Sequence, residues 1–202
     1  MTDINSEDVK RLRDATGAGW MDCKRALQEA DGDFDRATVL LREQHKADAK
    51  KLSSRSAGEG IVDAYLHAPD PNLPAKVGVL VELNCATDFV AKTERFRDLA
   101  RRVAQQIAAT QPAYVSREDV PGDVIEKEKE IYRKQAEGKP ANVVDKIVEG
   151  KLEKFYELMC LVDQPYIRDD SKKVGELLDE ASAELKEPVK VRRFAYFKVG
   201  AE

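Results

Sequence analysis

The sequence predicts an α+β protein, with an N-terminal three-helix module followed by a core of a small antiparallel sheet covered by helices. Within the first fifty residues, three short runs place apolar residues at helical spacing, and turns rich in glycine or aspartate separate them. The remainder holds three β-patterned runs, at residues 61–66, 76–83 and 189–199, with helical periodicity between them. These two observations favour separate helical and mixed regions over a repeating α/β pattern.

Composition restricts the class of protein. The 202 residues are 42% hydrophobic, which is enough for a core, and 36% are charged with a net charge of −4. This balance predicts no broad basic surface, so we expect no direct nucleic-acid partner. No apolar run approaches the roughly 18 residues of a membrane helix, and the acidic start differs from an export signal. We therefore expect a cytoplasmic protein without a membrane partner.

The reactive residue types show no catalytic arrangement. Cys23, Cys85 and Cys160 are far apart and lack the spacing of a zinc site or disulfide framework, which predicts reduced, packed thiols. A cysteine bridge between two chains stays open. Asp169 and Asp170 are better explained as helix caps than as metal ligands, because no third ligand is suitably spaced. We expect no catalytic residue, no metal, no cofactor and no covalent chemistry.

The N-terminal helices are predicted from caps and stripes. Asn5 or Ser6 caps a first helix, and the turn at 16–19 ends it. A second helix spans about 20–30, and Asp33 caps a third. The predicted domains are this module at 1–45, a frayed helix or tether at 46–58, and the core domain at 59–202.

The core elements follow in order. The first two β-patterned runs form a hairpin, and a long helix ends near Ala109. Ser116 and Asp119 have the spacing of a capping box before another helical region. Further helices are expected at about 141–159 and from Val174, with a polar loop between them and a final strand after them.

The segment 84–92 lies where a strand pattern ends and a helix pattern begins. Thr87 or Asp88 can cap that helix through a side-chain oxygen. Phe89 follows neither periodicity, although large aromatic residues are usually buried. From the residues alone, Phe89 fills the core beneath the helix or contacts a partner, and both interpretations stay open.

A six-residue segment that follows an apolar strand resembles the central motif of bacterial elongation factor Ts: Thr87-Asp88-Phe89-Val90-Ala91-Lys92. That family exchanges the guanine nucleotide of the GTPase elongation factor Tu. The resemblance implies that Asp88 and Phe89 press against the partner's nucleotide and magnesium site, with Thr87 and Val90 in the same contact.

The run from Val9 to Leu27 is similar to the N-terminal module of the same family, a ubiquitin-associated-like three-helix fold. The resemblance implies contacts to the GTPase domain from five residues of this run, although methionine is usual where Trp20 stands. The alternative is that Trp20 and Met21 belong to the module's own core. The five residues are Val9, Lys10, Arg13, Trp20 and Met21.

Further similar segments occur at 138–140, 148–151, 164–166, 170–175 and 193–200. The chain resembles the short form of the family, which lacks a second copy of the core, and this implies a homodimer. We therefore expect a guanine-nucleotide exchange factor that binds GDP-bound and nucleotide-free elongation factor Tu during translation elongation. The alternative is a ubiquitin-associated-like binding module fused to an α+β domain without a GTPase partner.

Overall fold

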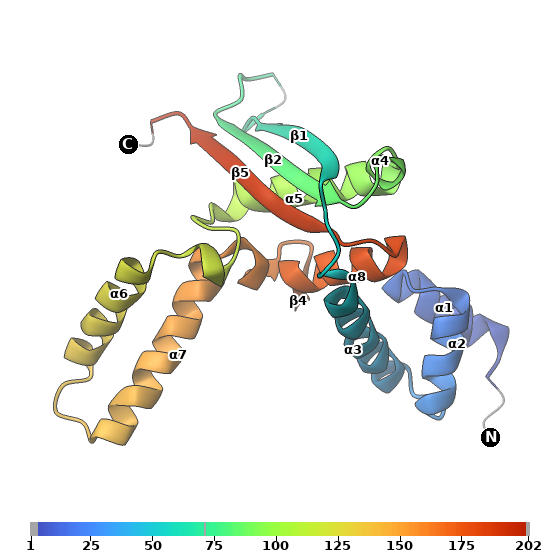
Figure 1. Ribbon diagram of the computed structural model, residues 1–202, viewed down its shortest axis with the longest axis horizontal. Coiled ribbons are helices and arrows are strands. Elements are labelled where there is room, and N and C mark those ends of the chain that lie inside the picture. The colour runs from blue at the N-terminus through green and yellow to red at the C-terminus, as the bar shows by residue number, and fades with distance from the viewer. Residues whose placement is uncertain (1–3, 71, 201–202) are drawn as a thin grey trace. The chain divides into compact units, whose positions relative to one another are not determined.

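The computed structural model describes residues 4–70 and 72–200, so the outermost residues of the predicted module and core, and one position of the hairpin loop, lie outside the described residues. Helices and small sheets together confirm the α+β class (Figure 1). Contacts divide the chain into two compact units. The first comprises the chain up to Ile61, Leu83–Arg97 and Glu176–Lys190, and the second comprises Val62–Glu82, Asp98–Gly175 and the chain from Val191.

The three predicted N-terminal helices are confirmed, and their caps are local. The Asn5 side chain caps the first helix by accepting hydrogen bonds from the Glu7 and Asp8 amides, both at 2.8 Å. Gly17 ends that helix in the left-handed conformation, with φ 71°, which glycine adopts without steric penalty. Asp33 caps the third helix. The helices are α1 (Ser6–Thr16), α2 (Trp20–Glu29) and α3 (Phe34–Leu52).

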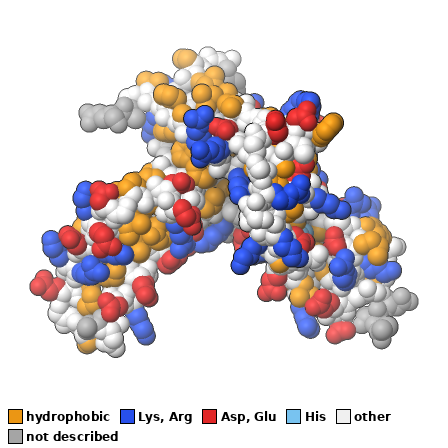
Figure 2. Space-filling view, in the orientation of Figure 1, with side chains coloured by type: hydrophobic (Ala, Val, Ile, Leu, Met, Phe, Trp, Pro, Cys, Tyr) orange, Lys and Arg blue, Asp and Glu red, His pale blue; other side chains and the backbone are white. Residues whose placement is uncertain are grey.

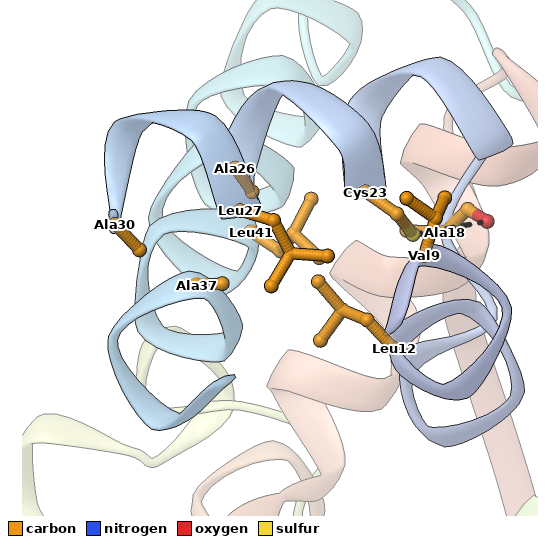
Figure 3. Packing of buried hydrophobic residues seen from close by; sticks show 9 residues of the cluster. All are labelled: Val9, Leu12, Ala18, Cys23, Ala26, Leu27, Ala30, Ala37 and Leu41. Carbon is orange, nitrogen blue, oxygen red and sulfur yellow. Dashed lines mark hydrogen bonds between the residues drawn. The ribbon is translucent and has the colours of Figure 1, made fainter. Parts of the chain in front are cut away.

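One hydrophobic cluster holds these helices together (Figure 3). Leu12, Leu27 and Leu41, one from each helix, are at most 1% exposed. Trp20, the first residue of α2, is 40% exposed and lies outside this cluster. The third helix continues to Leu52, so the first half of the predicted linker is helical.

A three-stranded sheet of order β1-β2-β5 forms the predicted antiparallel sheet (Figure 1). In β2, Val79, Val81 and Leu83 are at most 2% exposed, which confirms the alternation read from the sequence. Gly60 lies very close to the end of this strand. A Cβ at that position would be only 2.2 Å from the Leu83 carbonyl oxygen, so a side chain does not fit there. The strands are β1 (Glu59–His67), β2 (Val77–Cys85) and β5 (Lys190–Lys198).

Helix α5 supplies the apolar stripe that covers one face of the sheet (Figure 1). The residues of this stripe recur at helical spacing and are all at most 2% exposed: Phe96, Leu99, Val103 and Ile107. Arg101 donates a 2.6 Å hydrogen bond to the Ala64 carbonyl of β1. The helices after the hairpin are α4 (Asp88–Ala91) and α5 (Glu94–Thr110).

A helical hairpin follows, and Arg117 holds its base. The Arg117 guanidinium donates to both Asp163 and Glu153 in bidentate arrangements and lies 4.6 Å from the centre of the Tyr156 ring. The predicted capping box of Ser116 and Asp119 is present. The elements are the short 3₁₀ helices η1 (Arg117–Asp119) and η2 (Leu161–Asp163), with α6 (Gly122–Gln135) and α7 (Ala141–Met159).

The polar loop predicted before Val174, and the interpretation of Asp169 and Asp170 as helix caps, are wrong, because both residues lie in a strand. Pro165 pairs with Lys173 and Tyr166 with Asp169 in a two-stranded antiparallel sheet. Such short strands lack the alternation that identifies a strand in sequence. The last predicted helix follows directly. These elements are β3 (Pro165–Tyr166), β4 (Asp169–Lys173) and α8 (Val174–Leu185).

Candidate partner-binding site

The segment 84–92, hereafter the α4 corner, carries the site predicted from the sequence. β2 ends at Cys85, and the single-turn helix α4 begins at Asp88. Thr87 has extended backbone angles, φ −129° and ψ 152°, and its hydroxyl accepts a 3.4 Å hydrogen bond from the Val90 amide. Of the two candidate caps, Thr87 is therefore the cap, and Asp88 is the first helical residue.

Phe89 points into solvent from this helix. Its side chain is 79% exposed, so the interpretation of Phe89 as a core residue is wrong. The buried positions of the corner are taken by Cys85 and Ala91, which are at most 5% exposed, and Val90 is half-buried. Figure 2 shows a hydrophobic side chain projecting from the surface at the position of α4. The ring is therefore accessible to another protein, and aromatic residues are enriched among the residues that dominate protein–protein binding.

Asp88 is charged and lies at the surface beside Phe89. Its carboxylate accepts a 2.5 Å hydrogen bond from the Lys92 ammonium, one turn along the chain. This hydrogen bond lowers the pKa of Asp88 below its ordinary value. The corner therefore presents an aromatic ring and an ionised carboxylate side by side.

Glu187 holds the corner from 100 positions away in the sequence. Its carboxylate accepts hydrogen bonds from the Ala86 amide at 3.1 Å, the Thr87 amide at 3.0 Å and the Thr87 hydroxyl at 2.7 Å. Glu187 is 9% exposed. Sequence reasoning missed this residue, because a charged residue before Pro188 predicts a surface turn and no local pattern pairs it with Thr87.

The predicted contact residues of the N-terminal module divide into two groups. Lys10, Arg13 and Met21 are exposed, Met21 by 65%, and Trp20 is 40% exposed, so neither Trp20 nor Met21 is a core residue. Val9 is 2% exposed and packs inside the helical cluster of Figure 3. Val9 therefore supports the module's core and does not lie on the contact surface that the sequence suggested.

The module and the α4 corner belong to the same compact unit. The glycine turn before Trp20 lies beside the start of α5, since a Cβ at Gly17 would be 3.3 Å from the Arg95 guanidinium. Arg95 also pairs with Glu184 of α8. The structure thus brings the two parts of the predicted site into one unit, although they are distant in sequence.

Possible metal ligands and cysteines occur in the part of the chain that the structure describes. Among residues 4–70 and 72–200, no three His, Cys, Asp or Glu side chains are grouped to hold a metal ion. Cys23, Cys85 and Cys160 are buried and free, as predicted. Burial raises the pKa of each thiol, that of Cys160 to about 11, which disfavours the reactive thiolate.

In the described ranges, none of the helices combines the length and apolar character needed to cross a membrane.

Known proteins similar to this chain agree on one family. The profile of the family described as Elongation factor TS matches residues 32–201. Elongation factor Ts of Caldanaerobacter subterraneus subsp. tengcongensis is 55% identical over 199 residues, covering 98% of this chain and 97% of that protein. Those of Thermodesulfovibrio yellowstonii and Thermotoga maritima are 52% and 51% identical over 198 residues, covering 98% of this chain and 96% and 97% of their own lengths. The chain belongs to the elongation factor Ts family of translation elongation factors.

Proposed function

We propose that this protein is a guanine-nucleotide exchange factor that binds elongation factor Tu and promotes release of GDP during translation elongation in the cytoplasm. The single observation that carries the proposal, beside family membership, is the α4 corner. Phe89 is 79% exposed and stands beside the ionised Asp88 on a helix of one turn. These side chains are free to enter a site on another protein.

An exchange factor acts through differential affinity. It must bind nucleotide-free elongation factor Tu more tightly than the GDP-bound form, because a ligand shifts an equilibrium only by its preference for one state. A bound magnesium ion is among the largest local charges at a nucleotide site. Insertion of Phe89 with the carboxylate of Asp88 disturbs that ion's surroundings and weakens GDP binding. No covalent bond is made or broken.

The N-terminal module supplies a second contact. Lys10 and Arg13 on α1, with Trp20 and Met21 at the start of α2, form a mixed basic and apolar surface. This surface binds the GTPase domain away from the nucleotide and contributes affinity. The α4 corner then acts on a partner that is already held.

We further propose that two copies pair through the outer face of the sheet. Helix α5 covers one face, whereas Val62, Leu66 and Leu80 on the other are 67%, 72% and 46% exposed. The chain resembles the short form of the family, for which the resemblance implies that two chains pair, and it covers 97% of its Caldanaerobacter relative. A second identical chain is therefore the proposed occupant, in a two-fold symmetric dimer.

Release of a fluorescent GDP analogue from elongation factor Tu tests the exchange activity. Addition of the protein is expected to accelerate release in proportion to its concentration, up to saturation. A capture experiment with purified elongation factor Tu should give a stoichiometric complex that excess GDP dissociates. Unchanged release with no complex would contradict the proposal.

A further inference from the structure

We propose that Glu187 is a positioning residue for nucleotide exchange: it fixes the direction in which α4 presents Asp88 and Phe89 to the partner. The inference rests on the proposed function and adds to it a residue outside the contact surface. Glu187 itself is buried, so it acts through the corner that it holds.

Helix α4 cannot fix its own direction. It has four residues, and its few backbone hydrogen bonds run from the Ala91 amide to the Thr87 carbonyl at 3.2 Å, from the Lys92 amide to the Asp88 carbonyl at 3.1 Å, and from the Thr93 amide to the Val90 carbonyl at 3.0 Å, at its far end. A helix this short is unstable in isolation, because few hydrogen bonds offset the ordering of its backbone. Something outside the turn must therefore hold its first residues.

The carboxylate of Glu187 supplies that constraint. It accepts hydrogen bonds from the two backbone amides that precede the helix, those of Ala86 and Thr87, and from the Thr87 hydroxyl. The same hydroxyl accepts a hydrogen bond from the Val90 amide inside the turn. Glu187 thus determines the position of the cap and, through it, the first turn that carries Phe89. Hydrogen bonds to a carboxylate are stronger than neutral ones, which suits a fixed support.

Glu187 is in turn held firmly. Its amide donates to the Ser182 carbonyl of α8 at 3.2 Å, and the Ser182 hydroxyl accepts from the Val189 amide at 3.0 Å. Lys186 has a positive φ of 56°, which turns the chain back along the end of α8. Pro188 follows with a fixed φ. The support is therefore a rigid turn, and the corner does not need to order itself when a partner binds.

The test compares two substitutions of this residue. Glu187→Ala removes all three acceptor bonds and leaves the Ala86 and Thr87 amides without their acceptor. Glu187→Gln keeps the side-chain volume and an oxygen for the two amides but removes the charge. The maximal rate of GDP release at saturating variant is expected to fall about tenfold with Glu187→Ala and less with Glu187→Gln, because a small misplacement of positioned groups is costly.

A matched control separates positioning from loss of stability. Asp163 is a carboxylate of the other compact unit that also accepts several hydrogen bonds, in its case from Arg117, and its side chain is 13% exposed. Asp163→Ala is expected to lower the melting temperature without changing the maximal rate of release. Amide hydrogen exchange of free Glu187→Ala should accelerate at Ala86, Thr87 and Val90 more than in Asp163→Ala.

A double-mutant cycle gives the decisive outcome. If Glu187 acts through Phe89, then Glu187→Ala should change the maximal rate less than about twofold in a Phe89→Ala background. The reason is that the effects of two substitutions are not additive when the residues act together. Full release activity of Glu187→Ala, or an effect that multiplies completely with Phe89→Ala, overturns the positioning role. If Glu187→Ala does not fold, Glu187→Gln undergoes the same cycle. Failure of the wild-type protein to release GDP overturns the proposed function instead.

Discussion

The carboxylate of Asp88 accepts a 2.5 Å hydrogen bond from the Lys92 ammonium, and Phe89 stands exposed between these two residues in the sequence. The ion pair between Asp88 and Lys92 spans the single helical turn of α4. It keeps Asp88 ionised without burying it, since the two side chains are 50% and 70% exposed. A charge held in this way remains accessible to a partner.

Asp88→Asn separates charge from structure. Thr87 provides the cap, so loss of the Asp88 charge removes only an exposed ion pair, and the melting temperature is expected to stay close to that of the wild type. Release of fluorescent GDP should nevertheless slow, because the amide cannot perturb the partner's magnesium ion by charge. Asp145→Asn, at an exposed position of α7, is the control. If Asp88→Asn keeps wild-type release rates, the charge of Asp88 has no role in nucleotide exchange.

Trp20→Ala and Met21→Ala test the N-terminal module. Both side chains are exposed, so the fold should tolerate their loss. The concentration of exchange factor at half-maximal rate is expected to rise about tenfold or more while the maximal rate is kept, because the contact proposed for these residues would contribute affinity remote from the nucleotide. Val39→Ala, another exposed apolar residue of the module, should behave as wild type. A lower maximal rate with unchanged half-saturation would contradict this division of roles.

Phe197→Lys tests the dimer. Phe197 is 66% exposed in a single chain and lines a groove with Leu66 on the outer sheet face, so the substitution disturbs no core contact. Sedimentation of the wild type should give about twice 22.6 kDa, and that of the variant 22.6 kDa, because a buried lysine without a partner charge opposes association. Leu158→Lys on α7 is the control for an exposed apolar site. A monomeric wild type at micromolar concentration would end the dimer proposal.

Asp179 predicts a pH dependence of stability. Burial raises the pKa of this half-buried carboxyl of α8 to about 6, and Lys46 only partly opposes the effect. The pKa of Asp179 in the folded state lies above its unfolded value of about 3.9. Protonation of Asp179 therefore stabilises the fold at low pH, and this contribution is lost as pH rises through 6. Asp179→Asn should therefore gain about 1 kcal/mol at pH 8, after allowance for solvent screening.

The gain of Asp179→Asn should disappear at pH 4, where the wild-type carboxyl is itself protonated. Thermal melts at both pH values check this, with Asp145→Asn as the exposed control. A variant that melts below the wild type at pH 8 would show that attraction to Lys46 outweighs the burial of Asp179.

Regular elements were predictable because their burial is periodic. The stripe of α5 and the alternation of Val79, Val81 and Leu83 each repeat a pattern with one physical cause, one buried face. The two-stranded sheet that contains Tyr166 was missed, because strands of two and five residues show no such repeat. Its pairing uses backbone groups, which nearly every residue type carries, and even Pro165, which has no N–H to donate, takes part in it.

The candidate site was predictable only in part. The motif and the change of periodicity located Asp88 and Phe89, but periodicity cannot decide whether a corner side chain points inward. The structure decides this, because Cys85 and Ala91 already fill the buried positions. Glu187 was beyond reach of any local pattern, since its contact with Thr87 joins residues 100 positions apart.

The most direct test of the exchange mechanism is GDP release from elongation factor Tu with the double variant Phe89→Ala, Asp88→Asn, set beside its melting curve. The exposed Phe89 predicts a melting temperature near that of the wild type, whereas truncation of a buried aromatic would cost about 3–5 kcal/mol. Release should fall to near the rate of elongation factor Tu alone. A stable double variant that retains full exchange activity would contradict the role of the α4 corner.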